Sequence, residues 1–195
     1  GKKLGEHRGG YLPFHFDLSD ALVDGENVIT LCVRDQTEEA PYPRGKQKLV
    51  KKGKYGSLFY TPNSGIWKTV WMESVPADYV TGVRMNPRYD DAQIEMQINT
   101  TAPAAAKVTV SFAGETVFAG EVETDKKVRI DLPDFKAWSP DEPNLYDVVI
   151  EYGEDRVESY FAIRSLEVKK CGKYPRLCLN GKPYFFQMYI LILDK

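Results

Sequence analysis

The stretch QIEMQIN, at residues 93–99, alternates polar and apolar side chains without a break. Ile94, Met96 and Ile98 occupy every second position. Side chains two residues apart in a β-strand point to the same face of the sheet. The alternation therefore predicts a strand with one face in a core and the other in water.

The same two-residue period recurs further along the chain. It predicts strands at residues 108–112 and 128–132, and a pair of strands at residues 148–152 and 157–163 joined by a turn around Gly153. Glycine suits such a turn because it tolerates positive φ angles. No segment shows a helical apolar stripe. Short strands separated by turn signals about every ten residues are typical of a β-sandwich.

The first third of the chain contains two further apolar stretches. Residues 27–33 are expected to form a strand in which Cys32 is a small buried apolar side chain. Residues 66–72 are expected to form another strand. Trp67 and Trp71 lie four residues apart there, so they share a face and can anchor a core.

Composition excludes several classes of protein. The chain has 195 residues, of which 43% are hydrophobic and 28% charged, with a net charge of −2. These values are ordinary for a globular protein, and the length allows two packed cores. There is no basic excess to indicate nucleic-acid binding. No apolar run approaches the roughly 20 residues needed to cross a membrane.

The three cysteines do not indicate a disulfide framework, because their number is odd. Cys171 and Cys178 could pair or stay free, and the free state is favoured. His7 and His15 lie far from them in sequence, so no zinc spacing is present. The expectation is therefore that the chain holds no metal and no cofactor.

Four segments occur in an order that resembles one family of enzymes. They are GEHRGGYLPF at residues 5–14, SGIWKTVWME at 64–73, WSPDEPNLY at 138–146, and the stretch from Ile163-Arg164 to LNGKP at 179–183. Together they are similar to glycoside hydrolase family 2, the family of β-galactosidases, β-glucuronidases and β-mannosidases. The resemblance covers nearly the whole chain.

This resemblance implies an all-β fold in three parts. Residues 1–75 would be a partial jelly-roll of the sugar-binding type, residues 76–163 an immunoglobulin-like β-sandwich, and residues 164–195 a lead-in to an absent (β/α)₈ barrel.

The family hydrolyses O-glycosyl bonds with retention, using two glutamates of the barrel about 5–5.5 Å apart. A barrel needs about 250 residues. We therefore expect a non-catalytic fragment, cut at both ends, and assign none of the family's catalytic residues to this chain. The alternative is a stand-alone carbohydrate-binding or structural β-sandwich module.

Candidate substrate-binding residues are confined to the segment at residues 44–60. Tyr55 and Tyr60 could stack on sugar rings, because aromatic faces match the apolar faces of pyranoses. Lys46 belongs to a basic run that could grip an anionic sugar; a solvated loop is the alternative. Asp90 and Asp91 indicate a turn rather than a pair of catalytic carboxylates.

The expected partners follow from the same resemblance. Carbohydrate would be bound through the full-length enzyme, while neither nucleic acid nor a membrane is expected. Missing jelly-roll strands would leave open sheet edges, which predicts a homodimer through those edges. The sequence leaves the compartment open, with a bacterial periplasmic or secreted location favoured over the cytoplasm.

Overall fold

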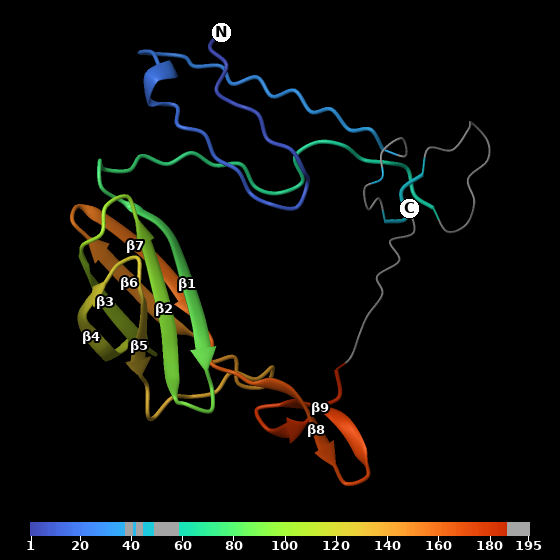
Figure 1. The fold of residues 1–195 in the computed structure, drawn as a ribbon, viewed down its shortest axis with the longest axis vertical. Helices are drawn as coiled ribbons and strands as arrows, with labels where there is room; N and C mark the ends of the chain where they lie inside the picture. The colour runs from blue at the N-terminus through green and yellow to red at the C-terminus, as the bar shows by residue number, and fades with distance from the viewer. Residues whose placement is uncertain (38–40, 42–44, 49–58, 187–195) are drawn as a thin grey trace. The chain divides into compact units, whose positions relative to one another are not determined.

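The computed structural model describes residues 1–37, 41, 45–48 and 59–186, and their fold is all-β (Figure 1). The chain divides into two compact units, Gly1–Trp71 and Met72–Lys195. The described strands form three antiparallel sheets. Only a single 3₁₀ turn, η1 (Ser19–Ala21), interrupts this pattern, so no described helix is long enough to cross a membrane. The division into three domains at residues 75 and 163 stays a prediction.

The first sheet of the second unit has three strands in the order β1-β2-β5. They are β1 (Val80–Arg88), β2 (Gln93–Thr100) and β5 (Lys127–Asp131). β2 is the strand predicted from the alternation, and it is central. Met85 of β1 and Val128 of β5 both lie opposite Met96, so the register aligns the apolar positions of all three strands.

The second sheet has four strands in the order β4-β3-β6-β7. They are β3 (Ala105–Phe112), β4 (Glu115–Glu123), β6 (Tyr146–Tyr152) and β7 (Asp155–Phe161). The predicted turn between β6 and β7 is present, with Gly153 at a φ of 56°. Asp155 accepts a hydrogen bond of 2.8 Å from the Val80 amide, which links β7 to β1 of the other sheet.

The two sheets face each other in Figure 1, and one hydrophobic core lies between them. Ile94, Met96 and Ile98 are at most 1% exposed, which confirms the predicted inward face of β2. Each buried side chain of this size contributes about 1.5–3 kcal/mol of hydrophobic free energy. The remaining buried members of the core are Ala106, Val108, Val110, Val122, Ile130, Leu132, Tyr146, Val148, Ile150, Tyr152, Phe161 and Ile163.

The third sheet is a hairpin that follows the two larger sheets in the chain. It consists of β8 (Leu166–Cys171), β9 (Tyr174–Leu179) and the short β10 (Lys182–Pro183). Asn180 ties its base to the preceding chain. Its amide nitrogen Nδ2 donates to the Trp138 carbonyl at 3.0 Å, and its Oδ1 accepts from the Ser165 amide at 3.0 Å.

The predictions for residues 27–33 and 66–72 are wrong. Residues 27–33 and 66–72 are not strands, because no described segment pairs with them. Cys32 is exposed rather than buried. Trp67 and Trp71 are 68% and 71% exposed and anchor no core, although the Trp67 indole donates to the Gly10 carbonyl at 2.9 Å. An apolar alternation leads to burial only where a partner strand or facing sheet covers it.

Candidate functional site

Two of the three predicted sugar-contacting residues lie next to each other. The Tyr60 amide donates to the Lys46 carbonyl at 2.8 Å, and the Lys48 amide donates to the Tyr60 carbonyl at 3.0 Å. These bonds form an isolated bridge between Gln47 and Tyr60. Tyr60 is 55% exposed, so its ring is accessible for stacking. Lys46 is also exposed.

The rest of that predicted site lies outside the described residues. This applies to Tyr55 and to the basic residues Arg44, Lys51, Lys52 and Lys54. Within the described part, the Lys48 ammonium lies 5.0 Å from the centroid of the Phe59 ring. Gln47 holds the segment in place, because its Oε1 accepts from the Asn63 amide at 2.7 Å. What the structure brings together here is an exposed tyrosine beside lysines.

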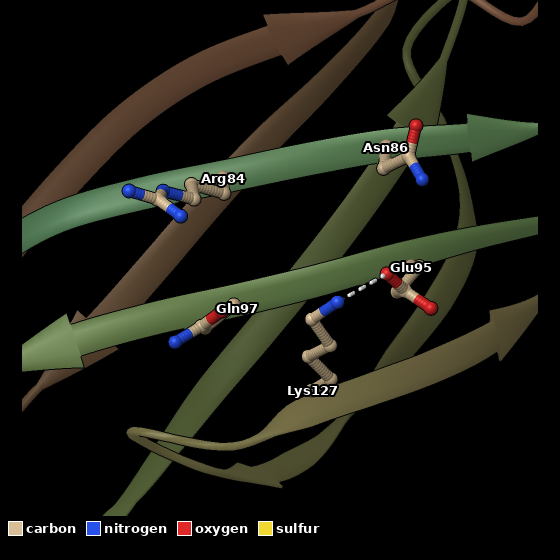
Figure 2. Close-up of a pocket in the computed structure, with 5 residues that line it drawn as sticks. All are labelled: Arg84, Asn86, Glu95, Gln97 and Lys127. Atoms are coloured by element: carbon tan, nitrogen blue, oxygen red, sulfur yellow. Dashed lines mark ion pairs between the residues drawn. The ribbon is translucent and has the colours of Figure 1, made fainter.

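A second candidate site is a polar pocket on the outer face of the first sheet (Figure 2). Arg84 and Asn86 come from β1, Glu95 and Gln97 from β2, and Lys127 from β5. All five are polar because they occupy the strand positions that alternate with the core residues. The pocket holds about 170 Å³.

Glu95 is the electrostatic centre of this pocket. Its side chain is only 15% exposed. The Lys127 ammonium lies 3.4 Å from Oε1, as the dashed line in Figure 2 marks, and the Arg129 Nε lies 3.7 Å from Oε2. Two cations around one carboxylate leave a local positive excess, which an anionic ligand would offset.

Arg84 and Asn86 remain available for a ligand. Within the described part of the chain, neither side chain takes part in an ion pair or a hydrogen bond. A guanidinium presents a planar set of donors suited to carboxylates, and an amide can both donate and accept. The pocket is smaller than the roughly 300–1,000 Å³ of typical ligand sites. It therefore suits one sugar ring or one carboxylate rather than an oligosaccharide.

The pocket does not have the chemistry of a retaining glycosidase. That mechanism needs two carboxylates flanking the scissile bond. Glu95 is the one carboxylate among the five lining residues, and it is paired with two cations. The arrangement can bind and orient a polar group, and it offers no second carboxylate as a general acid or nucleophile.

Sequence reasoning missed this pocket although its signal was present. The alternation at residues 93–99 places Glu95 and Gln97 on the solvent-facing side of a strand, but the sequence predictions include no strand at residues 80–88. There Val83 and Met85 alternate with Arg84 and Asn86, and the first pair packs against the core. The same alternation would have placed Arg84 and Asn86 beside Glu95 and Gln97.

Asp90 and Asp91 belong to a turn, as predicted. The Asp91 carboxylate accepts from the Arg88 Nε at 2.6 Å, and this contact raises the pKa of Arg88. The pair is thus part of the loop between β1 and β2. Among the described residues, no group of three or more histidine, cysteine, aspartate or glutamate side chains could hold a metal ion.

All three cysteines are free, which agrees with the preference stated for Cys171 and Cys178. The sulfur atoms of these two lie 4.0 Å apart. Burial, with the hydrogen bond to Cys171 as the second cause, raises the pKa of the Cys178 thiol. Cys178 is therefore protonated around neutral pH.

Comparison with known proteins identifies the family of this region. Residues 78–164, which include both large sheets, match the model described as glycosyl hydrolases family 2. A β-galactosidase from Thermoanaerobacter pseudethanolicus is 27% identical over 94% of this chain and 26% of its own length. A protein named putative β-glucuronidase from Formosa agariphila is 25% identical over 93% of this chain and 22% of its own length.

Part of the chain is also similar to solved structures. A Faecalibacterium prausnitzii β-glucuronidase is 32% identical over 57% of this chain and 18% of its own, with a TM-score of 0.48. The chain spans about a quarter of the length of the curated relatives it matches. It carries a glycosyl hydrolase family 2 region that corresponds to a minor part of those enzymes.

Proposed function

We propose that this chain is a non-catalytic β region of a family 2 glycoside hydrolase of the retaining, β-galactosidase-like type. In this proposal residues 76–163 are the immunoglobulin-like sandwich of such an enzyme and residues 1–75 part of its jelly-roll. Residues 164–195 lead into its (β/α)₈ barrel. The O-glycosyl bond would be hydrolysed in that barrel.

The observation that carries the proposal is the extent of the matches. Two curated relatives align over 93–94% of this chain but over 22–26% of their own lengths. Most of each relative, and with it room for a catalytic barrel, therefore lies outside the matched region. The Glu95 pocket has a single carboxylate, which also supports the proposal that hydrolysis takes place outside this region.

The rigidity of the two-sheet sandwich supports a role in holding a catalytic domain in place. The two sheets share a closed core, which makes them one stiff body. Asn180 bonds the base of the following hairpin to Trp138 and Ser165. Because the hairpin that follows the sandwich is bonded to it in this way, a stiff sandwich would hold the next part of a longer chain in a defined orientation.

A carbohydrate-binding module is the second candidate. Exposed Tyr60 beside Lys46 supports it. So do Arg84 and Asn86 of the polar pocket, whose side chains have no ion-pair or hydrogen-bond partner among the described residues. The homodimer through open sheet edges also stays a prediction.

Isothermal titration calorimetry of the pure chain separates the two candidates. The titrants are methyl β-galactoside and methyl β-glucuronide. As a non-catalytic scaffold, the chain is expected to show no saturable heat with a Kd below about 1 mM, since the Glu95 pocket is smaller than typical ligand sites.

Saturable binding would favour the module instead, and two variants would then locate it. Tyr60→Ala tests the tyrosine surface and Arg84→Ala tests the pocket. Arg156→Ala is the matched control for the second change, because Arg156 pairs with Glu158 on the other sheet. Loss of binding in only one test variant would assign the sugar site to that surface.

A further inference from the structure

The strand β8 is a free edge of the third sheet. The order of that sheet is β10-β9-β8, and β9 is the one described strand that pairs with β8. On one face of β8 the apolar side chains of Leu166 and Val168 are 58% and 66% exposed. An exposed strand edge is a template on which another strand can pair. The backbone groups and the charges of β8 indicate which strand fits this edge.

The backbone of β8 offers hydrogen-bonding groups at every second residue. The Tyr184 amide donates to the Leu177 carbonyl at 3.0 Å, so Leu177 of β9 directs its backbone groups away from β8. Val168 lies opposite Leu177. Opposite residues of an antiparallel pair exchange both backbone bonds or neither, so Val168 directs its N–H and C=O to the free edge. Leu166 and Lys170, two residues away on either side, do the same.

The charges of β8 are arranged symmetrically about Val168. Glu167 and Lys169 flank it, and both of their side chains lie on the face opposite to that of Val168. The Glu167 Oε1 and the Lys169 Nζ lie 2.7 Å apart, and the two side chains are 32% and 51% exposed. A two-fold axis through Val168 would place Glu167 opposite Lys169 of a second copy, and Lys169 opposite Glu167. The edge is therefore complementary in charge to itself.

One register satisfies both the backbone and the charges. Val168 opposite Val168 of a second copy aligns the outward groups of Leu166 with those of Lys170 and sets Glu167 opposite Lys169. The two charges then occupy a position without backbone bonds, where opposite side chains are closest. A slip of two residues would place Glu167 opposite Glu167, or Lys169 opposite Lys169. Like charges directly opposite each other destabilise a sheet, so the charges select the register centred on Val168.

We propose that β8 pairs antiparallel with β8 of a second copy of this chain, centred on Val168. Lysine on an edge strand normally discourages such pairing. Here Lys169 meets a carboxylate rather than a second lysine, so it stabilises the pair. The edge is short, which places the interface at the low end of specific interfaces, and a Kd of about 10–100 µM is expected.

The test is sedimentation velocity of the pure 195-residue chain, kept reduced, at concentrations that span the expected Kd. Lys169→Glu sets glutamate opposite Glu167, and Glu167→Lys sets lysine opposite Lys169. Both intermolecular ion pairs then change from attraction to repulsion, so each variant alone is expected to dimerise at least about tenfold more weakly. An equal mixture of the two variants restores opposite charges at both positions and is expected to recover the wild-type affinity.

Lys173→Glu is the matched control, because it makes the same change of charge in the turn of the same hairpin, outside the edge. It is expected to leave the affinity unchanged. Val168→Pro tests the backbone bonds, since it removes an N–H that points away from β9. We expect it to weaken the dimer without breaking the pairing of β8 with β9. Circular dichroism checks the fold of each variant.

Three results would overturn the proposal. One is a chain that stays monomeric over the whole range of concentrations. Another is a dimer of equal affinity in the wild-type chain and Lys169→Glu, which would assign pairing to another surface, such as the edges predicted for residues 1–75. The third is a mixture of Lys169→Glu and Glu167→Lys that dimerises as weakly as either variant alone.

Discussion

Replacing Tyr146 with alanine is expected to destabilise the two-sheet core by about 3–5 kcal/mol. Tyr146 is the largest fully buried side chain of the core and only 2% exposed. Its ring stacks on Phe161 with centroids 5.2 Å apart and lies 5.0 Å from the ring of Phe112. Its hydroxyl accepts a hydrogen bond of 2.6 Å from the Lys136 amide. Alanine would leave a cavity and an unpaired amide.

Urea unfolding followed by far-ultraviolet circular dichroism measures this loss, because all the described strands lie in the second unit. Tyr160→Ala is the matched control. Tyr160 is on the neighbouring strand opposite Asp147 and is 65% exposed, so its removal should change stability by no more than about 0.5 kcal/mol. Equal losses in the two variants would contradict the assignment of Tyr146 to the core.

Replacing Val148 with aspartate is expected to unfold the second unit at 25 °C. Val148 is buried at the centre of β6, between β3 and β7. A carboxylate there would lose its hydration with no cation beside it in the core. Burying an unpaired charge is one of the few single changes that can cost more than about 4 kcal/mol, which approaches the whole stability of a marginal domain.

The same substitution at an exposed position is the control for this prediction. Val117 lies on the edge strand β4 of the same sheet and is exposed. Val117→Asp should keep the far-ultraviolet spectrum and the dispersed amide signals of the folded chain, whereas Val148→Asp should lose both. Folded spectra for both variants would mean that β6 does not face a core.

The sandwich could be predicted because its sequence signal is local. In β2, burial follows directly from the alternation of Ile94 and Met96 with Glu95 and Gln97. Cross-strand partners supply the same alternation in β3 and β6. Sequence period and tertiary burial agree there because each strand is covered on one face.

The first unit could not be predicted in the same way. Residues 27–33 and 66–72 carry as strong an apolar pattern, yet Cys32, Trp67 and Trp71 are exposed. Whether a strand forms depends on a partner for its backbone groups, which a single segment does not reveal. Local alternation predicts the inward face of a strand only once that strand is paired.

In the candidate sites, too, residue types can be predicted from the sequence, whereas their positions depend on how segments pair. Tyr60 and Lys46 are candidates for sugar contact because of their side-chain chemistry. What places them together is the backbone bridge between Gln47 and Tyr60, which no sequence motif reveals. The Glu95 pocket needs three strands in register, so it follows from sheet order rather than from any one motif.

Hydrolysis of nitrophenyl β-galactoside and nitrophenyl β-glucuronide by the pure 195-residue chain tests the central claim most directly. A non-catalytic region of a family 2 enzyme is expected to release nitrophenol no faster than buffer alone, because the pocket described on its sheet offers a single carboxylate. A family 2 relative of full length serves as the positive control. Turnover by the chain that survives repeated purification and is lost in Val148→Asp would contradict the claim.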